Sequence, residues 1–480
     1  MGHSDLPEAA ERLDTPAIGR DEWVATHEQR TEGERRVARL YRRVPPSLRI
    51  GVLALLTIPI PFVLSTGDLY NFGLFAVLYA LLALGLNVTV GLAGLLDLGY
   101  IAFFGFGAYA YAIMASPHYG WHVQSEIAIP IVIGLSALLG LLLGLPSRRL
   151  LGDYLAIVTL FFGQAFVFFT GTTNPRGLTG GANGIPDLDP LNFFGIHIAT
   201  YRAFYWFSLG VFFLVLAGLW SVLRSRTGRA WQALREDPLA AELMGTPVNR
   251  LKLLAFSIGA SIAGLTGCIY AASAGSVASG SFDVPLLITI YAIVILGGIG
   301  SLTGVIVGAF VITVSYEILR PETPGTARVL FYLAIIVGVI AWARPYWRAA
   351  TILGGTLVFG FVVHAIAGAV SDTATAGSAI EAGRLAGAIE SWVVIPADPG
   401  RWPEYAYVAL IAAALVVSQL RGWWRTIALI PTLYLAAFVW ENLLIDQPSV
   451  TRLILFGALL MTLMIVRPQG LFGTSRVEIV

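Results

Sequence analysis

An all-α, polytopic membrane fold is predicted by three features: the composition, the length of the apolar segments and the distribution of arginine. Of the 480 residues, 57% are hydrophobic and only 12% are charged, whereas a soluble chain carries about a quarter charged residues. Apolar runs long enough to cross about 30 Å of hydrocarbon recur from Leu48 to Val466, which favours helices over barrel strands. We therefore expect about fourteen transmembrane helices, with both termini in the cytoplasm.

The apolar runs define the predicted spans. They are 49–65, 71–91, 98–115, 127–146, 153–172, 203–222, 251–273, 284–298, 302–319, 328–343, 350–370, 405–420, 425–444 and 451–466. With a cytoplasmic N-terminus, every second loop should be rich in arginine and lysine. The longer inside loops and the C-terminus follow this rule, whereas two very short inside loops, near Asp97 and Gly300, carry no basic residue.

The N-terminal segment 1–45 is charged from Asp5 to Arg43 and has no apolar stretch before Pro46. It therefore matches neither a cleaved signal peptide nor a membrane span. We interpret it as a cytoplasmic extension.

Several classes of active site are excluded by composition. Lys252 is the only lysine and lies between two leucines, so the chain has no conventional P-loop, and any ATP must be hydrolysed by another subunit. Cys268 is the only cysteine, and the histidines share no spacing suited to zinc,. These observations lead us to expect no catalytic site, no metal and no cofactor in this chain. Because the net charge is only +1, we also expect no nucleic acid partner.

Glycines interrupt two of the predicted spans. Gly91, Gly94 and Gly99 surround Asp97 in one place, and Gly297, Gly298 and Gly300 crowd together in another. Such interruptions can free backbone groups to line a polar path, which would make the second cluster gating glycines. The alternative is close helix packing through small residues.

The longest inside loop, 224–250, predicts a short helix along the membrane surface. Glu236 and Asp237 precede Pro238, a favourable helix-start residue, and Gly245 is a natural stop after Ala240 and Ala241,. Small alanines followed by glycine allow another protein to approach closely. The alternative is a solvated helix that touches nothing.

The residues Glu236, Ala240, Ala241 and Gly245 resemble the EAA-type coupling loop of ATP-binding cassette importer permeases. Five further stretches resemble, in the same order, the branched-chain amino acid permease family of the LivM type. They are GLNVTVGLAGLLDLGYIAFFGFGAYAYA from Gly85, GDYLAIVTLFFG from Gly152, TGGANGI from Thr179, VILGGIGSLTGVIVGA from Val294 and LFGALLMTLMIVRPQGLFG from Leu455.

This resemblance implies the permease subunit of an importer for leucine, isoleucine, valine or related solutes, in the inner membrane of a bacterial cell. The implied partners are a second, LivH-type permease, two cytoplasmic ATPase subunits that use ATP and Mg²⁺, an external substrate-binding protein and membrane lipid. Two alternatives stay open. Permeases for urea or short-chain amides are closely similar, and an ion-coupled secondary transporter would need buried ionisable groups, which the spans mostly lack.

Within the matching core, Asn87, Thr159 and Gln164 could hydrogen-bond an amino acid in transit, or they could bridge helices,. Gln164 stands where family members usually carry glutamate, so any role that needs a charge there is in doubt.

The resemblance also divides the chain. Residues 46–320 form a core and 451–480 a final core helix with a cytoplasmic C-terminus, which gives about ten core spans. Residues 321–450 have no recognised counterpart and hold about four extra spans, an even number that preserves topology. They could be a lipid-facing appendage, a contact for the second permease or a site for another subunit, and we favour the appendage.

Overall fold

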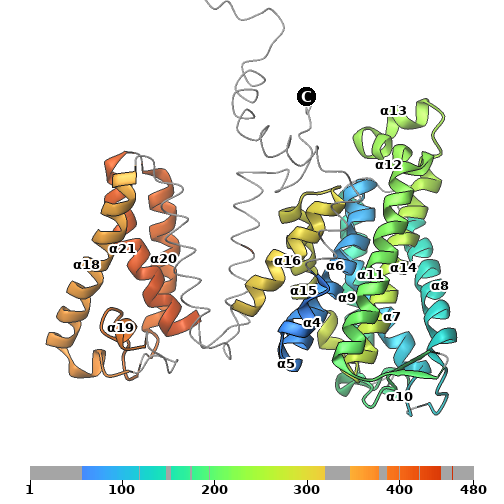
Figure 1. Cartoon of the computed structure of the whole chain (residues 1–480). Helices are drawn as coiled ribbons and strands as arrows, with labels where there is room; N and C mark the ends of the chain where they lie inside the picture. The colour runs from blue at the N-terminus through green and yellow to red at the C-terminus, as the bar shows by residue number, and fades with distance from the viewer. Residues whose placement is uncertain are drawn as a thin grey trace, which may run out of the picture. The chain divides into compact units, whose positions relative to one another are not determined.

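The computed structural model describes residues 57–117, 119–146, 153–172, 176–193, 195–318, 346–377, 386–398, 400–420, 422–444 and 457. These residues are mostly helical (Figure 1). We describe three parts separately: the short helix α4 (Ile60–Val63), a core from Thr66 to Ile318 and a C-terminal unit from Tyr346 to Leu444.

The described part of the core contains eight long helices. They are α6 (Phe75–Leu86), α7 (Tyr100–Met114), α8 (Ser125–Gly144), α9 (Asp153–Gly171), α11 (Tyr201–Arg224), α14 (Val248–Ala274), α15 (Val284–Gly297) and α16 (Leu302–Ile318). Shorter elements connect them: α5 (Thr66–Asp68), η2 (Leu69–Leu74), η3 (Asn87–Leu92), α10 (Arg176–Thr179), η5 (Gly181–Asn183), α12 (Arg226–Glu236), α13 (Pro238–Leu243) and η6 (Ser279–Phe282). Of these, η2 and η3 are π-helical and extend α6 at its two ends.

Among the described residues, eight helices are long and apolar enough to cross a membrane, and three shorter apolar helices accompany them. Each coincides with a predicted span. The predicted spans 328–343 and 451–466, and most of 49–65, lie outside the described residues, so the total of about fourteen stays a prediction.

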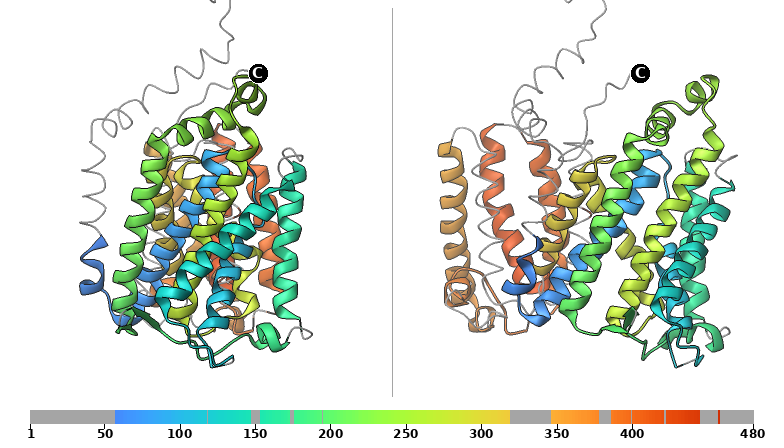
Figure 2. Two further views of the ribbon diagram at one scale, coloured as in Figure 1. Left: turned by 90° about the vertical axis from the view of Figure 1, so that its right-hand side faces the viewer. Right: turned by 45° about the vertical axis from the view of Figure 1, so that its right-hand side comes forward.

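Helix α14 is the centre of the core and packs against α6, α7 and α8; Figure 2 shows the core helices running side by side. Glycines bring α7 and α14 to backbone contact. A Cβ on Gly107 would overlap the carbonyl oxygen of Gly264, and one on Gly267 would overlap that of Phe104. Small residues therefore hold these helices together, as in other membrane bundles.

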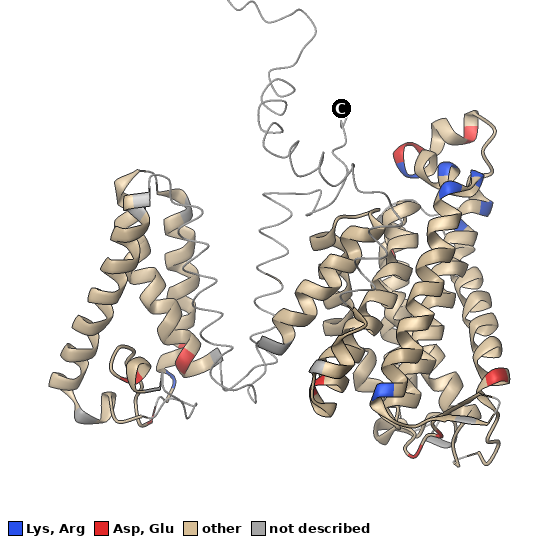
Figure 3. Ribbon diagram, viewed as in Figure 1, with Lys and Arg blue, Asp and Glu red and all other residues tan. Residues whose placement is uncertain are grey.

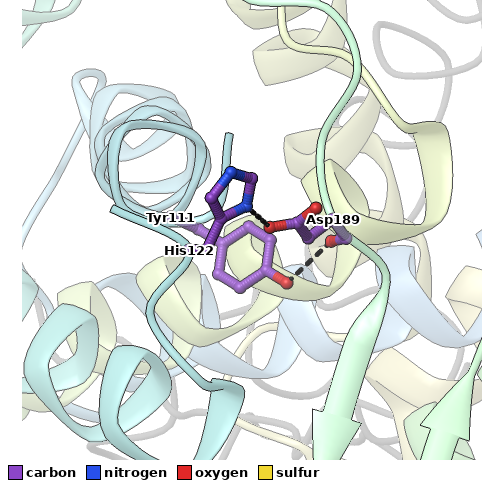
Figure 4. A network of polar contacts seen from close by, with 3 residues as sticks. All are labelled: Tyr111, His122 and Asp189. Atoms are coloured by element: carbon purple, nitrogen blue, oxygen red, sulfur yellow. Dashed lines mark hydrogen bonds and ion pairs between the residues drawn. The ribbon is translucent and has the colours of Figure 1, made fainter. Parts of the chain in front are cut away.

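One end of the core, which we call the outer end, is closed by the loops around β1 (Leu191–Phe193) and β2 (Ile196–Ile198), an antiparallel pair. This hairpin is a local addition to the predicted all-α fold. Figure 4 shows how the loop is held: the Tyr111 hydroxyl donates to the Asp189 carbonyl oxygen over 3.0 Å, and His122 Nδ1 lies 2.6 Å from Asp189 Oδ2.

The opposite end, which we call the inner end, carries α12 and α13. Basic residues gather there (Figure 3), and the arginines of this loop are Arg224, Arg226, Arg229, Arg235 and Arg250. The cytoplasmic orientation of the loop 224–250 stays a prediction from these same arginines.

The C-terminal unit consists of α18 (Tyr346–Val370), η7 (Asp372–Ala374), α19 (Ala386–Glu390), α20 (Trp402–Gln419), α21 (Trp423–Val439) and η8 (Trp440–Leu444). The segment between α19 and α20 contacts the middle of α18. There, Trp392 Nε1 donates a hydrogen bond to the Leu357 carbonyl oxygen over 3.0 Å. Asn442 Nδ2 in turn donates to the Val394 carbonyl oxygen over 3.0 Å. The unit thus has polar contacts of its own.

The glycine contact between α7 and α14 generates a stability prediction. We expect Gly267→Leu to lower the thermal unfolding temperature of the purified full chain by several degrees, because overpacking a tight contact costs about 1–3 kcal/mol. Gly210→Leu is the control, since Gly210 is also helical but meets no atom within 4 Å. Equal unfolding temperatures for the two variants would contradict the packing described here.

Candidate functional site

The helix pair at the inner end is built by local capping. Asp237 ends α12, and its Oδ1 accepts hydrogen bonds from Leu239 N (2.9 Å) and Ala240 N (3.0 Å) at the start of α13. Pro238 occupies the first helical position, where a missing N–H costs nothing. The predicted helix start is therefore confirmed.

Helix α13 ends as its sequence predicts. Gly245 has a φ of 79°, a left-handed conformation that favours glycine. Gly245 N donates to Glu242 O (2.9 Å) and Thr246 N to Ala241 O (3.0 Å), the paired bonds of a Schellman motif. Of the predicted coupling residues, Glu236, Ala240 and Gly245 are exposed and Ala241 is buried.

Besides Glu242, the exposed surface at α13 is apolar. Leu239, Leu243 and Met244 are 68%, 81% and 86% exposed. Such exposure is notable because these apolar residues lie outside the candidate membrane spans. We call these three residues the apolar tip.

Helix α12 is fixed to the core by Trp231. Its side chain is fully buried, and Nε1 donates to the Leu251 carbonyl oxygen over 3.0 Å. Because Leu251 lies in the first turns of α14, Trp231 anchors α12 to the central helix of the core.

Arg235 extends from the end of α12 to both glycine interruptions. Its guanidinium donates to the Gly91 carbonyl oxygen in η3. A Cβ on Gly300 would overlap Arg235 Nη1, and one on Gly94 would lie 3.0 Å from Arg235 Cγ. Glycine at these positions therefore makes room for the arginine side chain.

Asn87 connects the two interruptions directly. It is fully buried, and its Oδ1 accepts a hydrogen bond of 2.8 Å from Gly300 N, in the turn between α15 and α16. Gly298 and Gly300 have φ values of 114° and 85°. Gly297 packs closely, since a Cβ there would overlap the Gly304 carbonyl oxygen.

Thr159 performs a similar bridging role on α9. Its Oγ1 accepts from Leu98 N over 2.9 Å, beside Asp97, whose carbonyl oxygen accepts from the Tyr291 hydroxyl over 2.6 Å. The segment between η3 and α7 is thereby tied to both α9 and α15. Gln164 is not part of this arrangement and lies on the exposed face of α9, near Phe161 and Phe168.

The structure thus brings Asn87, Gly91 and Gly300 together and adds Arg235, which sequence reasoning missed. In the sequence, Arg235 is one of several basic residues in the loop 224–250. Helix-bridging contacts are observed for Asn87 and Thr159, while a role in the substrate path stays a prediction for both and for Gln164.

Comparisons with known proteins identify the class. A family described as "Branched-chain amino acid transport system / permease component" matches residues 69–340, and the chain belongs to this family. It is therefore a multi-pass membrane protein of the permease class. The match runs past residue 320, where the predicted insertion begins.

The chain is similar to permeases of two kinds from branched-chain amino acid transport systems. The high-affinity branched-chain amino acid transport system permease protein LivM of Escherichia coli is 38% identical over 333 residues, covering 65% of this chain and 75% of the relative. LivH of Salmonella typhimurium, from a system of the same name, is 26% identical over 263 residues, covering 49% of this chain and 80% of the relative. No solved structure matches the chain.

The Arg235 contact predicts a change in local stability. We expect Arg235→Ala to speed hydrogen exchange of the α12 amides about tenfold or more, because a hydrogen bond from a charged donor contributes about 1.5–3 kcal/mol. Arg229→Ala is the matched control, since Arg229 is exposed on the same helix and donates only to the nearby Arg224 carbonyl oxygen. Identical exchange rates in the two variants would refute the anchoring role.

Proposed function

We propose that this chain is a transmembrane permease subunit of an ATP-binding cassette importer for leucine, isoleucine and valine. The observation that carries the proposal is the inner-end helix pair, which exposes an apolar tip and is anchored to both interrupted helices of the core. The names of the LivM and LivH relatives support the cargo and the pairing with a second permease.

The apolar tip is suited to a protein partner. Exposed leucine and methionine outside a membrane span form a surface that a complementary groove would cover. We infer that one of two cytoplasmic ATPase subunits provides this groove. ATP and Mg²⁺ would be used there, so the permease itself would need no catalytic site and no cofactor.

The mechanism follows from the anchors of α12. ATP-driven closure of the ATPases would push α13, and α12 would carry the displacement because Trp231 and Arg235 fix it to the core. The displacement would reach η3 and the turn between α15 and α16. Rocking of these elements would then open the core alternately to each side of a bacterial inner membrane, where an external binding protein delivers the amino acid.

Replacing the tip should weaken assembly. We expect Leu243→Ser combined with Met244→Ser to reduce co-purification of the ATPase subunits at least fivefold, because the buried apolar area of the contact is lost. Gln232→Ser on the exposed face of α12 is the control. Undiminished co-purification of the double variant would remove the apolar tip from the interface.

The identity of the transported solute is tested by measuring the rate at which the assembled complex hydrolyses ATP. We expect a leucine-loaded binding protein to stimulate hydrolysis, because loaded binding protein favours the closed ATPases through the permease. If a binding protein loaded with urea or a short amide stimulated hydrolysis instead, the transported solute would be reassigned within the family. Transport that persists without ATP but stops when ion gradients collapse would indicate a secondary transporter.

A further inference from the structure

The core contains a cavity of about 240 Å³ between α6, α7, α14, α15 and α16. It is partly open, since six of its nine lining residues, among them Tyr79, Tyr270 and Tyr316, are only partly buried. Tyr270 lies four residues before the end of α14, and Tyr316 lies near the end of α16. Because both helices finish at the outer end, the cavity is displaced toward that side of the core.

One wall of the cavity comes from a single face of α6. Phe75, Leu78, Tyr79 and Leu82 line it at the spacing that places helical residues on one side. Aromatic rings continue the wall, since the ring of Tyr270 lies 6.3 Å from Phe75 and 5.3 Å from Phe104. The cavity can therefore hold a compact aliphatic group against these apolar surfaces.

The polar atoms of the lining are hydroxyl groups. Tyr79, Tyr270, Tyr316 and Ser281 contribute them, and none of the nine lining residues carries a formal charge. The Tyr316 hydroxyl lies 3.2 Å from Thr289 Oγ1. Hydroxyl groups can donate to a carboxylate, and aromatic faces attract an ammonium group. An uncharged lining should hold such a zwitterion weakly enough to release it.

The size and position of the cavity also fit a transported solute. Pockets for drug-sized ligands measure about 300–1,000 Å³, so this cavity suits something smaller. The helix that forms its wall continues from α6 into η3, where Gly91 meets Arg235. A displacement of α12 would therefore act on the same helix that shapes the cavity.

We propose that this cavity is a transient binding site for a small aliphatic amino acid during its passage through the permease. The inference rests on the proposed function and adds the position of the bound solute. Neither Asn87 nor Thr159 lines this cavity, so the site differs from the predicted substrate path.

A filling substitution tests the site in the assembled complex. At saturating leucine-loaded binding protein, we expect Phe75→Trp to lower the maximal rate of leucine transport at least tenfold, because the larger ring occupies the cavity. Phe72→Trp is the control, since Phe72 belongs to the same continuous span and lies against Phe310, outside the lining. Equal rates in the two variants would overturn the inference, whereas a wild-type complex that transports no leucine would overturn the proposed function.

A labelling experiment tests binding without transport. In a chain with Cys268→Ala, which removes the only native cysteine, Ser281→Cys should react with a methanethiosulfonate reagent at least fivefold more slowly in millimolar leucine. Gly280→Cys is the adjacent control, because Gly280 is exposed and does not line the cavity. No protection by leucine, or no reaction at Ser281→Cys, would contradict the proposed site.

Discussion

The contact of Arg235 with the Gly91 carbonyl oxygen is the interaction on which the account of this permease depends. A π-helical segment and a glycine turn both leave backbone groups without their usual helical partners. In this core, Asn87 and Arg235 satisfy two of those groups. The stability of the interrupted segments is therefore coupled to the position of α12, which lies at the inner end.

This coupling explains the glycines at three positions near Arg235 and the turn between α15 and α16. Gly91 and Gly300 leave room for Asn87 and Arg235, while Gly297 permits α15 and α16 to touch. A larger residue at any of these positions would separate the elements that the arginine holds together. Close packing is observed at these residues, and gating stays a prediction for them.

The sequence predicted the helices well because hydrocarbon thickness and backbone satisfaction restrict each span to about twenty apolar residues. Asp237, Pro238 and Gly245 predicted the ends of α13 for the same local reasons that the structure displays. Arg235 and the cavity could not be predicted, because both depend on contacts between segments far apart in the chain. The β1–β2 hairpin was missed since its strands have only three residues each.

The most direct test of the coupling claim compares transport with ATP hydrolysis in the complete complex, reconstituted in proteoliposomes with the Arg235→Ala permease. We expect ATP hydrolysis to continue at a rate close to wild type, while the number of leucine molecules transported per ATP falls at least tenfold. Transport falls because α12 no longer moves η3. An unchanged ratio of leucine to ATP would contradict the account, since the helix pair would then act on the core without this contact.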